Sequence, residues 1–340
     1  MSTTISVEPF GESFECTDGE TILDAALRNG FFLKYGCRHG GCGTCKVVLS
    51  DGDVEGEGST FAVSTGERAD GVILACSSRP ATDCAIDVEA MELTEEEFRA
   101  GDQVAVFEAD VASLEWLTHD TCALSLMLRS PASMPFTAGQ FVNVVVPGTD
   151  LVRSYSLANA PDDSDRIDLI VKVLPGGAFS GLLASGLGVG DSLTLHGPLG
   201  ELRLRLSHRR VLMVAGGSGL APFLSMLRNL ERRNRPREID LVFGARTRTD
   251  LYLVEELERL AVALPGFRFL PTISEPDTSP WNGDRGLVTE VISARYESLD
   301  GYDAYLAGPP AMIEATIPVL TGLGVRPANV HFDAFVPSRR

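Results

Sequence analysis

The hydrophobic pattern of the 340-residue chain changes twice, and each part predicts different elements. In the first part, apolar positions at helical spacing predict a short helix over residues 21–28, and alternation over residues 81–88 predicts a strand. We expect Asp18 or Thr21 to cap this helix and the Asn-Gly pair at residues 29–30 to end it. This part therefore combines strands with a helix.

The middle of the chain predicts short strands. Alternating runs are separated by turn residues, and helical periodicity is absent until about residue 177. Several short strands at this spacing are typical of an antiparallel β-barrel. The expected strands are Gln103–Asp110, Cys122–Leu128, Phe141–Val146, Arg153–Asn159, Ile167–Val173 and Ser192–His196.

From residue 209 onward, the pattern predicts alternating strands and helices. Residues 211–215 form a continuous apolar run, which is typical of a buried parallel strand. A glycine-rich turn follows this run, and a helix is expected over residues 222–233. This order predicts an α/β domain with a parallel sheet. Further expected elements are strands over 239–246, 267–273 and 302–307, a helix over 254–263 and a polar loop over 274–286.

Composition and charge narrow the class of protein. The chain is 44% hydrophobic and 22% charged, which is ordinary for a globular protein and argues against disorder. Its 29 basic and 47 acidic residues give a net charge of −18, which argues against binding to nucleic acid or to an anionic membrane. An apolar run of about 20 residues is absent, so no transmembrane helix is expected. The first residues lack the pattern of a secretory signal, so we expect a cytoplasmic protein.

Four of the seven cysteines follow a pattern that indicates metal chemistry. The spacing is C-x4-C-x2-C, followed by a fourth cysteine after 30 residues. This is the ligand spacing of a plant-type [2Fe–2S] cluster, in which four thiolates bind two irons. Four glycines between residues 36 and 43 allow the backbone to wrap closely around such a cluster. The predicted ligands are Cys37, Cys42, Cys45 and Cys76.

Other interpretations of the cysteines fit the sequence less well. A structural zinc site ordinarily uses two C-x2-C hooks, and this chain has one. His39 lies within the loop, but a Rieske centre needs two histidines in place of two cysteines, so we expect His39 to be a surface residue. Cys16, Cys84 and Cys122 lie in no motif, and we expect them to pack as small hydrophobic side chains.

Residues 1–95 resemble the plant-type ferredoxin domain, and this resemblance implies a β-grasp fold. They carry 17 acidic and six basic residues, a net charge of −11, so most of the acidity of the chain lies here. A polar stretch follows, in which we predict a linker over residues 96–102. The expected domains therefore span residues 1–95, 103–206 and 207–340.

Two motifs in the middle region resemble the flavin-binding pair of the ferredoxin–NADP reductase-like family, R-x-Y-S followed by G-x-x-S. The resemblance implies a β-barrel that binds FAD, and a short helix is expected over residues 180–185. An arginine and a helix N-terminus suit a diphosphate. The tyrosine and the last serine of the first motif would lie against the isoalloxazine ring, which makes Ser156 a candidate catalytic residue. Alternatively, Tyr155 is a core residue and the second motif is a simple helix cap. The motif residues are Arg153, Ser154, Tyr155, Ser156, Gly176, Gly177 and Ser180.

The glycine-rich turn resembles the pyridine-nucleotide turn of the same family. It reads G-G-S-G-x-x-P between a strand and a helix, which is the context that a dinucleotide site requires. A later Gly-Pro-Pro tripeptide resembles the nicotinamide-side C-G-P-P motif, with Ala307 in place of the cysteine. Arg246, at the end of the second strand, is expected to meet the adenosine ribose. The predicted nucleotide-binding residues are Gly216, Gly217, Gly219, Pro222, Arg246, Gly308, Pro309 and Pro310.

The C-terminal segment resembles the aromatic–acid–x–aromatic ending of the family, which returns to the flavin. Asp333 and Phe335 match those positions, so Asp333 is a candidate catalytic residue and Phe335 a candidate flavin contact. An edge strand with core aromatic side chains is the alternative. The domain order favours NADH by resemblance, although Arg246 and Arg248 leave NADPH open.

The order of the three domains resembles the reductase component of bacterial multicomponent oxygenases. This resemblance implies electron transfer from NADH to FAD, to the [2Fe–2S] cluster and then to an external oxygenase. The N-terminal domain looks most like those of alkene and propane monooxygenase reductases, so the expected partner is a diiron hydroxylase that docks on the acidic ferredoxin domain. The alternatives are a partner Rieske dioxygenase, a deoxysugar-dehydrating system, and an iron–sulfur sensor, which would not need the nucleotide turn.

Overall fold

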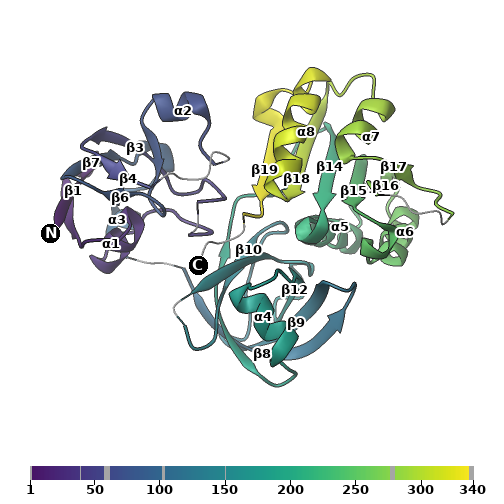
Figure 1. Ribbon diagram of the computed structural model, residues 1–340, viewed down its shortest axis with the longest axis horizontal. Coiled ribbons are helices and arrows are strands. Elements are labelled where there is room, and N and C mark those ends of the chain that lie inside the picture. The colour runs from purple at the N-terminus through teal and green to yellow at the C-terminus, as the bar shows by residue number, and fades with distance from the viewer. Residues whose placement is uncertain are drawn as a thin grey trace. The chain divides into compact units, whose positions relative to one another are not determined.

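A computed structural model of the chain describes residues 2–38, 40–56, 62–101, 104–149, 151–275 and 280–336. The chain divides into two compact units (Figure 1). The first unit comprises residues 1–105 and 336–340, and the second unit comprises residues 106–335. His39, which we expected at the surface, lies outside the described residues. No helix in the described residues is long and apolar enough to cross a membrane.

The first unit contains a five-stranded mixed sheet in the order β2-β1-β7-β3-β5. β1 pairs in parallel with β7, and the other neighbouring strands are antiparallel. Helix α1 (Ile22–Arg28) packs its apolar side into the core of this sheet, so the expected β-grasp fold is confirmed. The strands are β1 (Thr3–Glu8), β2 (Glu12–Cys16), β3 (Lys46–Asp51), β4 (Val54–Glu55), β5 (Val72–Leu74), β6 (Arg79–Pro80) and β7 (Cys84–Asp87), and the other helices are α2 (Thr65–Ala69) and α3 (Glu95–Arg99).

Local signals in the sequence set the ends of α1. Thr21 is its N-cap, and the Thr21 hydroxyl accepts a hydrogen bond from the Asp24 amide at 3.2 Å. Asn29 is the C-cap that follows the last helical residue, and Gly30 comes next with a φ of +82°. Both ends therefore lie where the sequence predicted them. The cysteines outside the cluster motif, Cys16, Cys84 and Cys122, are buried, as expected for small hydrophobic side chains.

The structure differs from the predicted linker over residues 96–102. Helix α3 occupies Glu95–Arg99, with a capping box at its N-terminus. Phe98 is fully buried and stacks against Phe10 and Phe31, with ring centroids 4.8 and 4.9 Å apart. These aromatic contacts hold the polar stretch on the first unit. The linker prediction missed them because they join residues that are distant in sequence.

The second unit begins with a six-stranded antiparallel sheet in the order β11-β10-β13-β8-β9-β12. A bridge between Leu157, which directly follows β11, and Leu169 of β12 joins the two edges of the sheet, so it closes into the expected β-barrel. Helix α4 (Ala178–Ser185) packs Phe179 and Leu183 into the barrel core. The strands are β8 (Val106–Trp116), β9 (Thr121–Ser130), β10 (Phe141–Val145), β11 (Val152–Ser156), β12 (Arg166–Lys172) and β13 (Ser192–Leu199).

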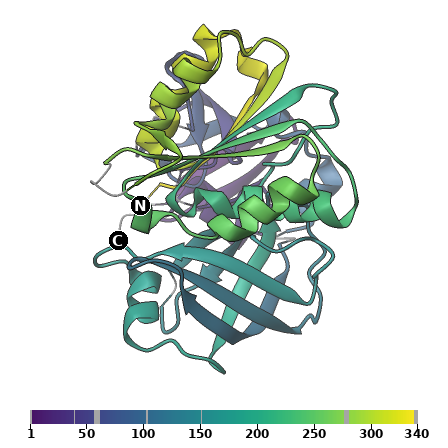
Figure 2. The same cartoon turned by 90° about the vertical axis from the view of Figure 1, so that its right-hand side faces the viewer.

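The rest of the second unit is a six-stranded parallel sheet in the order β17-β16-β15-β14-β18-β19, with helices on its faces (Figure 2). The chain order reverses between β14 and β18, and the carboxyl ends of strands at such a switch point form the usual ligand site of an α/β sheet. The strands are β14 (Arg210–Gly216), β15 (Ile239–Ala245), β16 (Phe267–Ile273), β17 (Asp284–Arg285), β18 (Tyr302–Gly308) and β19 (Val330–Ala334). The helices are α5 (Leu220–Arg232), α6 (Val254–Ala263), α7 (Val288–Arg295) and α8 (Pro310–Gly322), of which α7 and α8 were not predicted.

Helix α5 lies between the parallel sheet and the β-barrel (Figures 1 and 2). One hydrophobic cluster joins Met226 of α5 to Met213 of the sheet and to Ala158 and Leu202 of the barrel part. A Cβ atom added to Gly139 would lie 2.5 Å from the Met226 Cε atom, so the barrel backbone approaches the helix closely. The barrel and the sheet therefore share a core around α5.

Candidate redox-cofactor sites

The four predicted cluster ligands approach one another in two pairs. The Cys37 amide donates to Cys42 Sγ at 3.4 Å, and the Cys42 amide donates to Cys37 Sγ at 3.4 Å. Contact with Cys45 raises the pKa of Cys76, and burial adds to this effect. Contact with Cys37 likewise raises the pKa of Cys42. Crowded thiolates repel one another, so a site of this kind suits a positively charged metal centre.

Backbone and hydroxyl groups of the loop around the cysteines lie close to the sulfur atoms. The Gly41 amide donates to Cys37 Sγ at 3.2 Å, and Thr44 Oγ1 lies 3.3 Å from Cys42 Sγ. Gly43 has a φ of +73°, a conformation that glycine adopts without strain. Donors aimed at sulfur stabilise the thiolate charge and tune the potential of a bound cluster.

The arrangement of these donors fits two irons better than one zinc ion. A structural zinc site places four donors around a single ion. Two pairs of cysteines match a [2Fe–2S] cluster, in which the four thiolates are divided between two irons.

The R-x-Y-S motif lies on β11, which pairs with β10. Ser154 Oγ donates to Oδ1 of the buried Asn143 at 2.7 Å, and Ser156 is itself buried. Alternate residues of a strand face opposite sides, so Arg153 and Tyr155 share the other face. The Arg153 guanidinium donates to a neighbouring backbone carbonyl at 2.8 Å and, in the part of the chain that the structure describes, pairs with no carboxylate. A half-buried guanidinium of this kind suits an anionic ligand.

The G-x-x-S motif begins α4 beside this strand. Gly177 is the N-cap of α4, and Ser180 Oγ accepts a backbone hydrogen bond at 3.2 Å. A Cβ atom at Gly177 would lie 2.3 Å from Ser180 Oγ, and Gly176 has a φ of +71°. The rings of Tyr155 and Phe179 lie 5.4 Å apart, so the structure brings the two motifs together. A strand whose arginine pairs with no carboxylate of the described residues, beside a helix N-terminus, fits a diphosphate.

The glycine-rich turn joins β14 to α5 at the carboxyl end of the parallel sheet. Residues Gly217–Gly219 form a 3-10 turn, and Gly217 has a φ of +54°. Pro222 is the third residue of α5 and lies in its first turn, where a missing N–H removes no helical hydrogen bond. The backbone N–H groups of such a turn and helix start form an anion site, which suits the diphosphate of a dinucleotide.

Two glycines let the ends of β14 and β18 meet at the switch point. A Cβ atom at Gly219 would lie 2.0 Å from the Ala307 carbonyl oxygen. A Cβ atom at Gly308 would lie 2.7 Å from the Gly216 carbonyl oxygen. The prolines at 309 and 310 then form the N-cap and the first residue of α8. The Gly-Pro-Pro tripeptide therefore lies directly beside the glycine-rich turn.

The C-terminal segment runs along β18 as the edge strand β19. The register pairs Asp333 with Ala307, and the Phe335 amide donates to the Gly308 carbonyl at 2.9 Å. The alternative of an edge strand is thus correct for Val330–Ala334, and the same pairing brings Asp333 and Phe335 to the switch point. Phe332 is exposed, so this strand does not place all its aromatic side chains in the core.

Comparison with protein families finds three matches, in the order of these sites along the chain. Residues 5–81 match the 2Fe-2S iron-sulfur cluster binding domain. Residues 108–204 match the oxidoreductase FAD-binding domain, and residues 213–317 match the oxidoreductase NAD-binding domain. The expected cofactors, a [2Fe–2S] cluster, FAD and NAD(H), are therefore confirmed.

Two relatives resemble the chain over almost its whole length. The reductase component of phenol 2-monooxygenase from Pseudomonas sp. strain CF600 is 40% identical over 326 residues, which cover 94% of this chain and 90% of that protein. The reductase component of propane 2-monooxygenase from Gordonia sp. strain TY-5 is 34% identical over 336 residues. The match covers 97% of this chain and 96% of that protein. The chain belongs to the reductase components of bacterial multicomponent oxygenases. The electron transfer component of toluate 1,2-dioxygenase from Pseudomonas putida is 34% identical to this reductase and covers 95% of each chain.

Solved structures agree with this family. The Amycolatopsis cytochrome P450 reductase GcoB is 33% identical to the reductase, with a TM-score of 0.77 over 99% of this chain and 100% of that chain. The ferredoxin reductase in carbazole 1,9a-dioxygenase is 29% identical, with a TM-score of 0.73 over 99% of each chain. All three parts of the reductase therefore have counterparts in single solved chains.

Two side chains beside the glycine-rich turn were not predicted. Lys172 is the last residue of β12. A Cβ atom added to Gly217 would lie 3.8 Å from the Lys172 Cδ atom. Its ammonium group pairs with Asp120 at 2.6 Å. The buried Tyr252 donates its hydroxyl to the Gly217 carbonyl at 2.7 Å. The sequence gives no local signal for either residue, because each comes to the turn from a different element.

Arg246 follows β15 directly, as the sequence predicted, and is exposed together with Arg248. The Arg246 carbonyl accepts a hydrogen bond from the Glu275 amide at 2.7 Å. The end of the second strand is where an adenosine ribose binds in dinucleotide folds. The preference of the reductase for NADH over NADPH stays a prediction.

Proposed function

We propose that the reductase takes electrons from NADH and delivers them, through FAD and the [2Fe–2S] cluster, to the hydroxylase of a diiron monooxygenase. The observation that carries the proposal is the presence of paired cysteines, an R-x-Y-S strand and a glycine-rich turn in one chain. Bound FAD accepts the two electrons of a hydride and passes them on singly, as a [2Fe–2S] cluster requires. The residues of the chain bind, orient and insulate these groups.

A monooxygenase partner is supported by the names of the two relatives reported first, which serve phenol and propane 2-monooxygenases. The toluate 1,2-dioxygenase relative supports a Rieske dioxygenase as the second candidate. The test mixes the reductase and NADH with the purified oxygenase component of a phenol monooxygenase, a propane monooxygenase or a toluate dioxygenase. The measurement is the amount of oxygenated product formed in each mixture. Product with a phenol or propane hydroxylase would support the first candidate. Product with the dioxygenase component alone would overturn it.

The proposed FAD site lies where the two flavin motifs meet. Arg153 and the N-terminus of α4 would hold the diphosphate, Tyr155 would lie against the isoalloxazine, and Ser156 would offer its hydroxyl where β11 ends. Asp333 and Phe335, in the C-terminal segment, would approach the flavin from the side of β19. The support is the contact between the motifs and the arginine that pairs with no carboxylate within the described residues.

Arg153→Ala is expected to lower the FAD content of the purified reductase. The diphosphate loses a charge-assisted contact worth about 1.5–3 kcal/mol, so the FAD dissociation constant rises about 10- to 100-fold. The measurement is flavin content and FAD titration by fluorescence. The matched control is Arg129→Ala, since Arg129 is a half-exposed arginine on β9 that pairs with Asp110. Full retention of FAD by Arg153→Ala would remove Arg153 from the site.

We also propose that the nucleotide binds across the switch point. The glycine-rich turn with Pro222 holds the diphosphate, Arg246 meets the ribose, and the Gly-Pro-Pro tripeptide flanks the nicotinamide. The close approach of the Gly219 and Gly308 backbones supports this placement. The predicted functional parts, 1–95, 103–206 and 207–340, are supported by the three family matches, which fall inside them.

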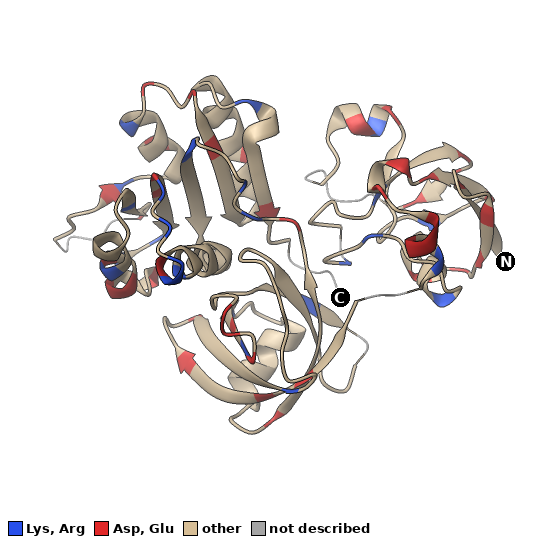
Figure 3. Ribbon diagram, turned by 180° about the vertical axis from the view of Figure 1, so that it is seen from behind, with Lys and Arg blue, Asp and Glu red and all other residues tan. Residues whose placement is uncertain are grey.

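The oxygenase is proposed to dock on the acidic surface of the first unit. Acidic residues occur along α2, α3 and several strands of this unit (Figure 3). Many of its cations are neutralised locally, as in the pairs Arg28–Glu20, Lys46–Glu67 and Arg99–Glu12. Lys46 follows Cys45 and pairs with Glu67, so α2 and its C-cap Asp70 lie near the end of the cluster loop. An acidic surface beside the cluster suits a partner with a basic patch.

Asp70→Asn combined with Glu92→Gln is expected to slow electron delivery to the oxygenase about two- to fivefold at low ionic strength. Asp70 is exposed at the end of α2, and the Glu92 carbonyl accepts a hydrogen bond from Lys34, which precedes the cluster loop. The measurement is the oxygenase-dependent rate across a salt series. Glu258→Gln, an exposed charge on α6, is the control and should have no effect. Rates that do not respond to salt in any variant would contradict electrostatic docking.

A cytoplasmic location is proposed as well. The three cysteines outside the cluster motif, Cys16, Cys84 and Cys122, are buried and form no disulfide in the described part of the chain. Unpaired cysteines are typical of a reducing compartment. Cell fractionation of the native organism tests this, and recovery in a periplasmic fraction would overturn it.

A further inference from the structure

We infer that Arg228 positions the nucleotide-binding turn of the reductase against its flavin strand by fixing α5 to the β-barrel. The inference rests on the FAD and nucleotide sites proposed above. It concerns the geometry of hydride transfer between them. Arg228 acts through α5 and the loop after β11, so it is a positioning residue.

Helix α5 connects the two proposed sites. The helix begins at Leu220, directly after the 3-10 turn Gly217–Gly219, so any movement of its axis carries the turn with it. The loop over residues 157–165 begins directly after Ser156, the last residue of β11. A bond between α5 and this loop therefore couples the nucleotide turn to the flavin strand.

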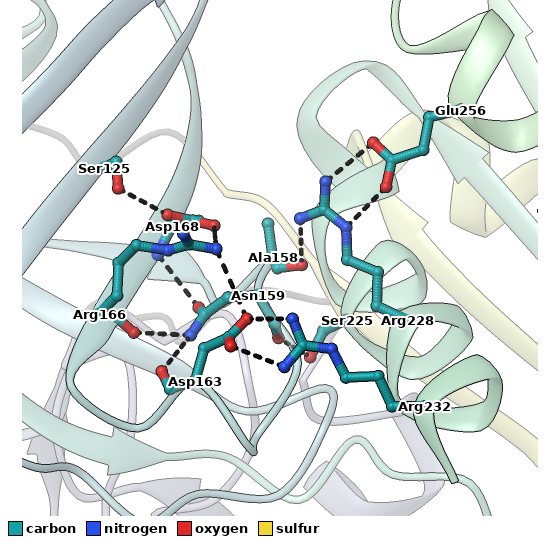
Figure 4. A network of polar contacts seen from close by, with 10 residues as sticks. All are labelled: Ser125, Ala158, Asn159, Asp163, Arg166, Asp168, Ser225, Arg228, Arg232 and Glu256. Atoms are coloured by element: carbon teal, nitrogen blue, oxygen red, sulfur yellow. Dashed lines mark hydrogen bonds and ion pairs between the residues drawn. The ribbon is translucent and has the colours of Figure 1, made fainter. Parts of the chain in front are cut away.

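Arg228 links α5 to this loop, and each of its three guanidinium nitrogens donates a hydrogen bond (Figure 4). Its Nη1 donates to the Ala158 carbonyl at 3.0 Å, and its Nε and Nη2 donate to the two carboxylate oxygens of Glu256, each at 2.8 Å. Glu256 lies on α6 in the nucleotide-binding part. Its carboxylate therefore orients the Arg228 guanidinium, and the remaining nitrogen of that guanidinium binds the barrel part. The side chains of Arg228 and Glu256 are only 25% and 22% exposed, which shields this pair from solvent more than an ordinary surface ion pair.

A buried hydrogen bond one turn earlier on α5 fixes the same loop (Figure 4). Ser225 Oγ donates to the Asn159 carbonyl at 2.7 Å, and both residues are fully buried. The Asn159 side chain donates to the carbonyls of Asp163 and Arg166 at 3.0 and 2.6 Å and accepts from the Asp168 amide at 3.0 Å. Because Asp168 lies on β12, these hydrogen bonds anchor the loop in the barrel.

A second ion pair extends the contact one turn further along α5. Arg232 donates to both carboxylate oxygens of Asp163, at 2.6 and 2.7 Å. Residues 225, 228 and 232 lie on one face of the helix, because they follow its period. Arg166 pairs with Asp168 at 3.0 Å, which links this network back to the barrel strands. Three successive turns of α5 are therefore held by one loop.

Hydride transfer is sensitive to this kind of control. The reacting atoms must approach to about 3–3.5 Å, and a misplacement of about 1 Å lowers the rate about 100-fold. Binding of the nucleotide depends on the turn itself, whereas alignment with the flavin depends on how α5 is held. Loss of the Arg228 contacts should therefore change the rate of the transfer step more than the affinity for NADH.

The test compares Arg228→Met, Arg228→Lys and the wild-type reductase in anaerobic stopped-flow experiments with NADH. Arg228→Met keeps an apolar stem and removes the donors. Its limiting rate constant for flavin reduction should fall about 10- to 100-fold, while the NADH dissociation constant stays within about threefold. Arg228→Lys should recover part of the rate, because an ammonium reaches Ala158 or Glu256 but cannot form the fork to both.

The matched control is Arg259→Met. Arg259 on α6 pairs with Glu231 on α5, so it too bridges these helices, but it has no hydrogen bond to the barrel part among the described residues. Hydrogen–deuterium exchange without NADH supplies a second readout. Exchange in the loop over residues 157–165 should rise in Arg228→Met and stay at the wild-type level in Arg259→Met.

Three results would overturn the inference. One is a limiting rate constant in Arg228→Met equal to that of the wild type. Another is an equal loss of rate in Arg259→Met. The third is a loss of FAD and NADH affinity together with the rate, since that is the result of general destabilisation. A wild-type flavin that NADH does not reduce would instead refute the proposed function, and the inference with it.

Discussion

Cys42→Ser is expected to abolish NADH-driven reduction of cytochrome c by the reductase, while its NADH–ferricyanide turnover stays within about twofold of the wild-type value. Cys42 is paired with Cys37, and its sulfur accepts the Cys37 amide at 3.4 Å. Replacement of one thiolate leaves one iron without its ligand pair, so the route to one-electron protein acceptors is cut. Ferricyanide accepts electrons directly from the flavin, and the flavin site lies in the second unit. Parallel assays with the two acceptors, together with iron analysis, make this measurement.

Cys84→Ser is the matched control for this experiment. Cys84 lies in the same unit but outside the cluster motif, and its Sγ lies 3.3 and 3.1 Å from the carbonyl oxygens of Asp53 and Thr82. A serine hydroxyl finds acceptors there, so both activities should be preserved. Loss of both activities in Cys42→Ser would contradict a modular arrangement of flavin and cluster. Zinc in place of iron in the wild-type protein would show that the cluster assignment is wrong.

Gly219→Ala is expected to lower NADH-driven reduction of every acceptor about 100-fold or more, because it disturbs the nucleotide turn at its closest contact. The added methyl group would lie 2.0 Å from the Ala307 carbonyl oxygen and 2.7 Å from the Gly308 amide nitrogen. Both neighbours are backbone atoms, so relief requires the turn and the end of β18 to separate. The measurement is NADH affinity and the rate of flavin reduction. Dithionite should still reduce both the flavin and the cluster in this variant, because their own sites are unchanged.

The control for this variant is Gly322→Ala, which lies in α8 of the same sheet domain. A Cβ atom there meets nothing within 4 Å, so the activity should equal that of the wild type. Taken together, Cys42→Ser and Gly219→Ala interrupt the route at opposite ends. Normal NADH oxidation by Gly219→Ala would contradict the assignment of the nucleotide site.

The hydrophobic pattern predicted the barrel and the parallel sheet well, because alternation and continuous apolar runs are local consequences of burial. It missed α3, since the burial of Phe98 depends on Phe10 and Phe31, which are distant in the chain. It missed α8 because apolar residues occur on most sides of this helix and because Pro318, a residue that usually ends helices, lies within it. Elements fixed by distant contacts thus carry little signal in a single sequence.

The same distinction applies to the sites. Cluster ligands, flavin motifs and the glycine-rich turn are compact in sequence, so spacing and resemblance were enough to name them. Lys172 reaches the turn from the barrel, and Ser225 binds the carbonyl of Asn159, 66 residues earlier in the chain. No local pattern marks such contacts. The residues that align the proposed sites, in contrast to those that bind cofactors, therefore required the structure.

In the reductase, one chain connects a nucleotide site to a [2Fe–2S] cluster through a flavin. The most direct test is the EPR spectrum of the purified reductase after anaerobic addition of NADH. We expect the signal of a reduced [2Fe–2S] cluster, in protein that contains about two irons per chain. A cluster that dithionite reduces but NADH leaves EPR-silent, in protein that retains its FAD, would contradict the account.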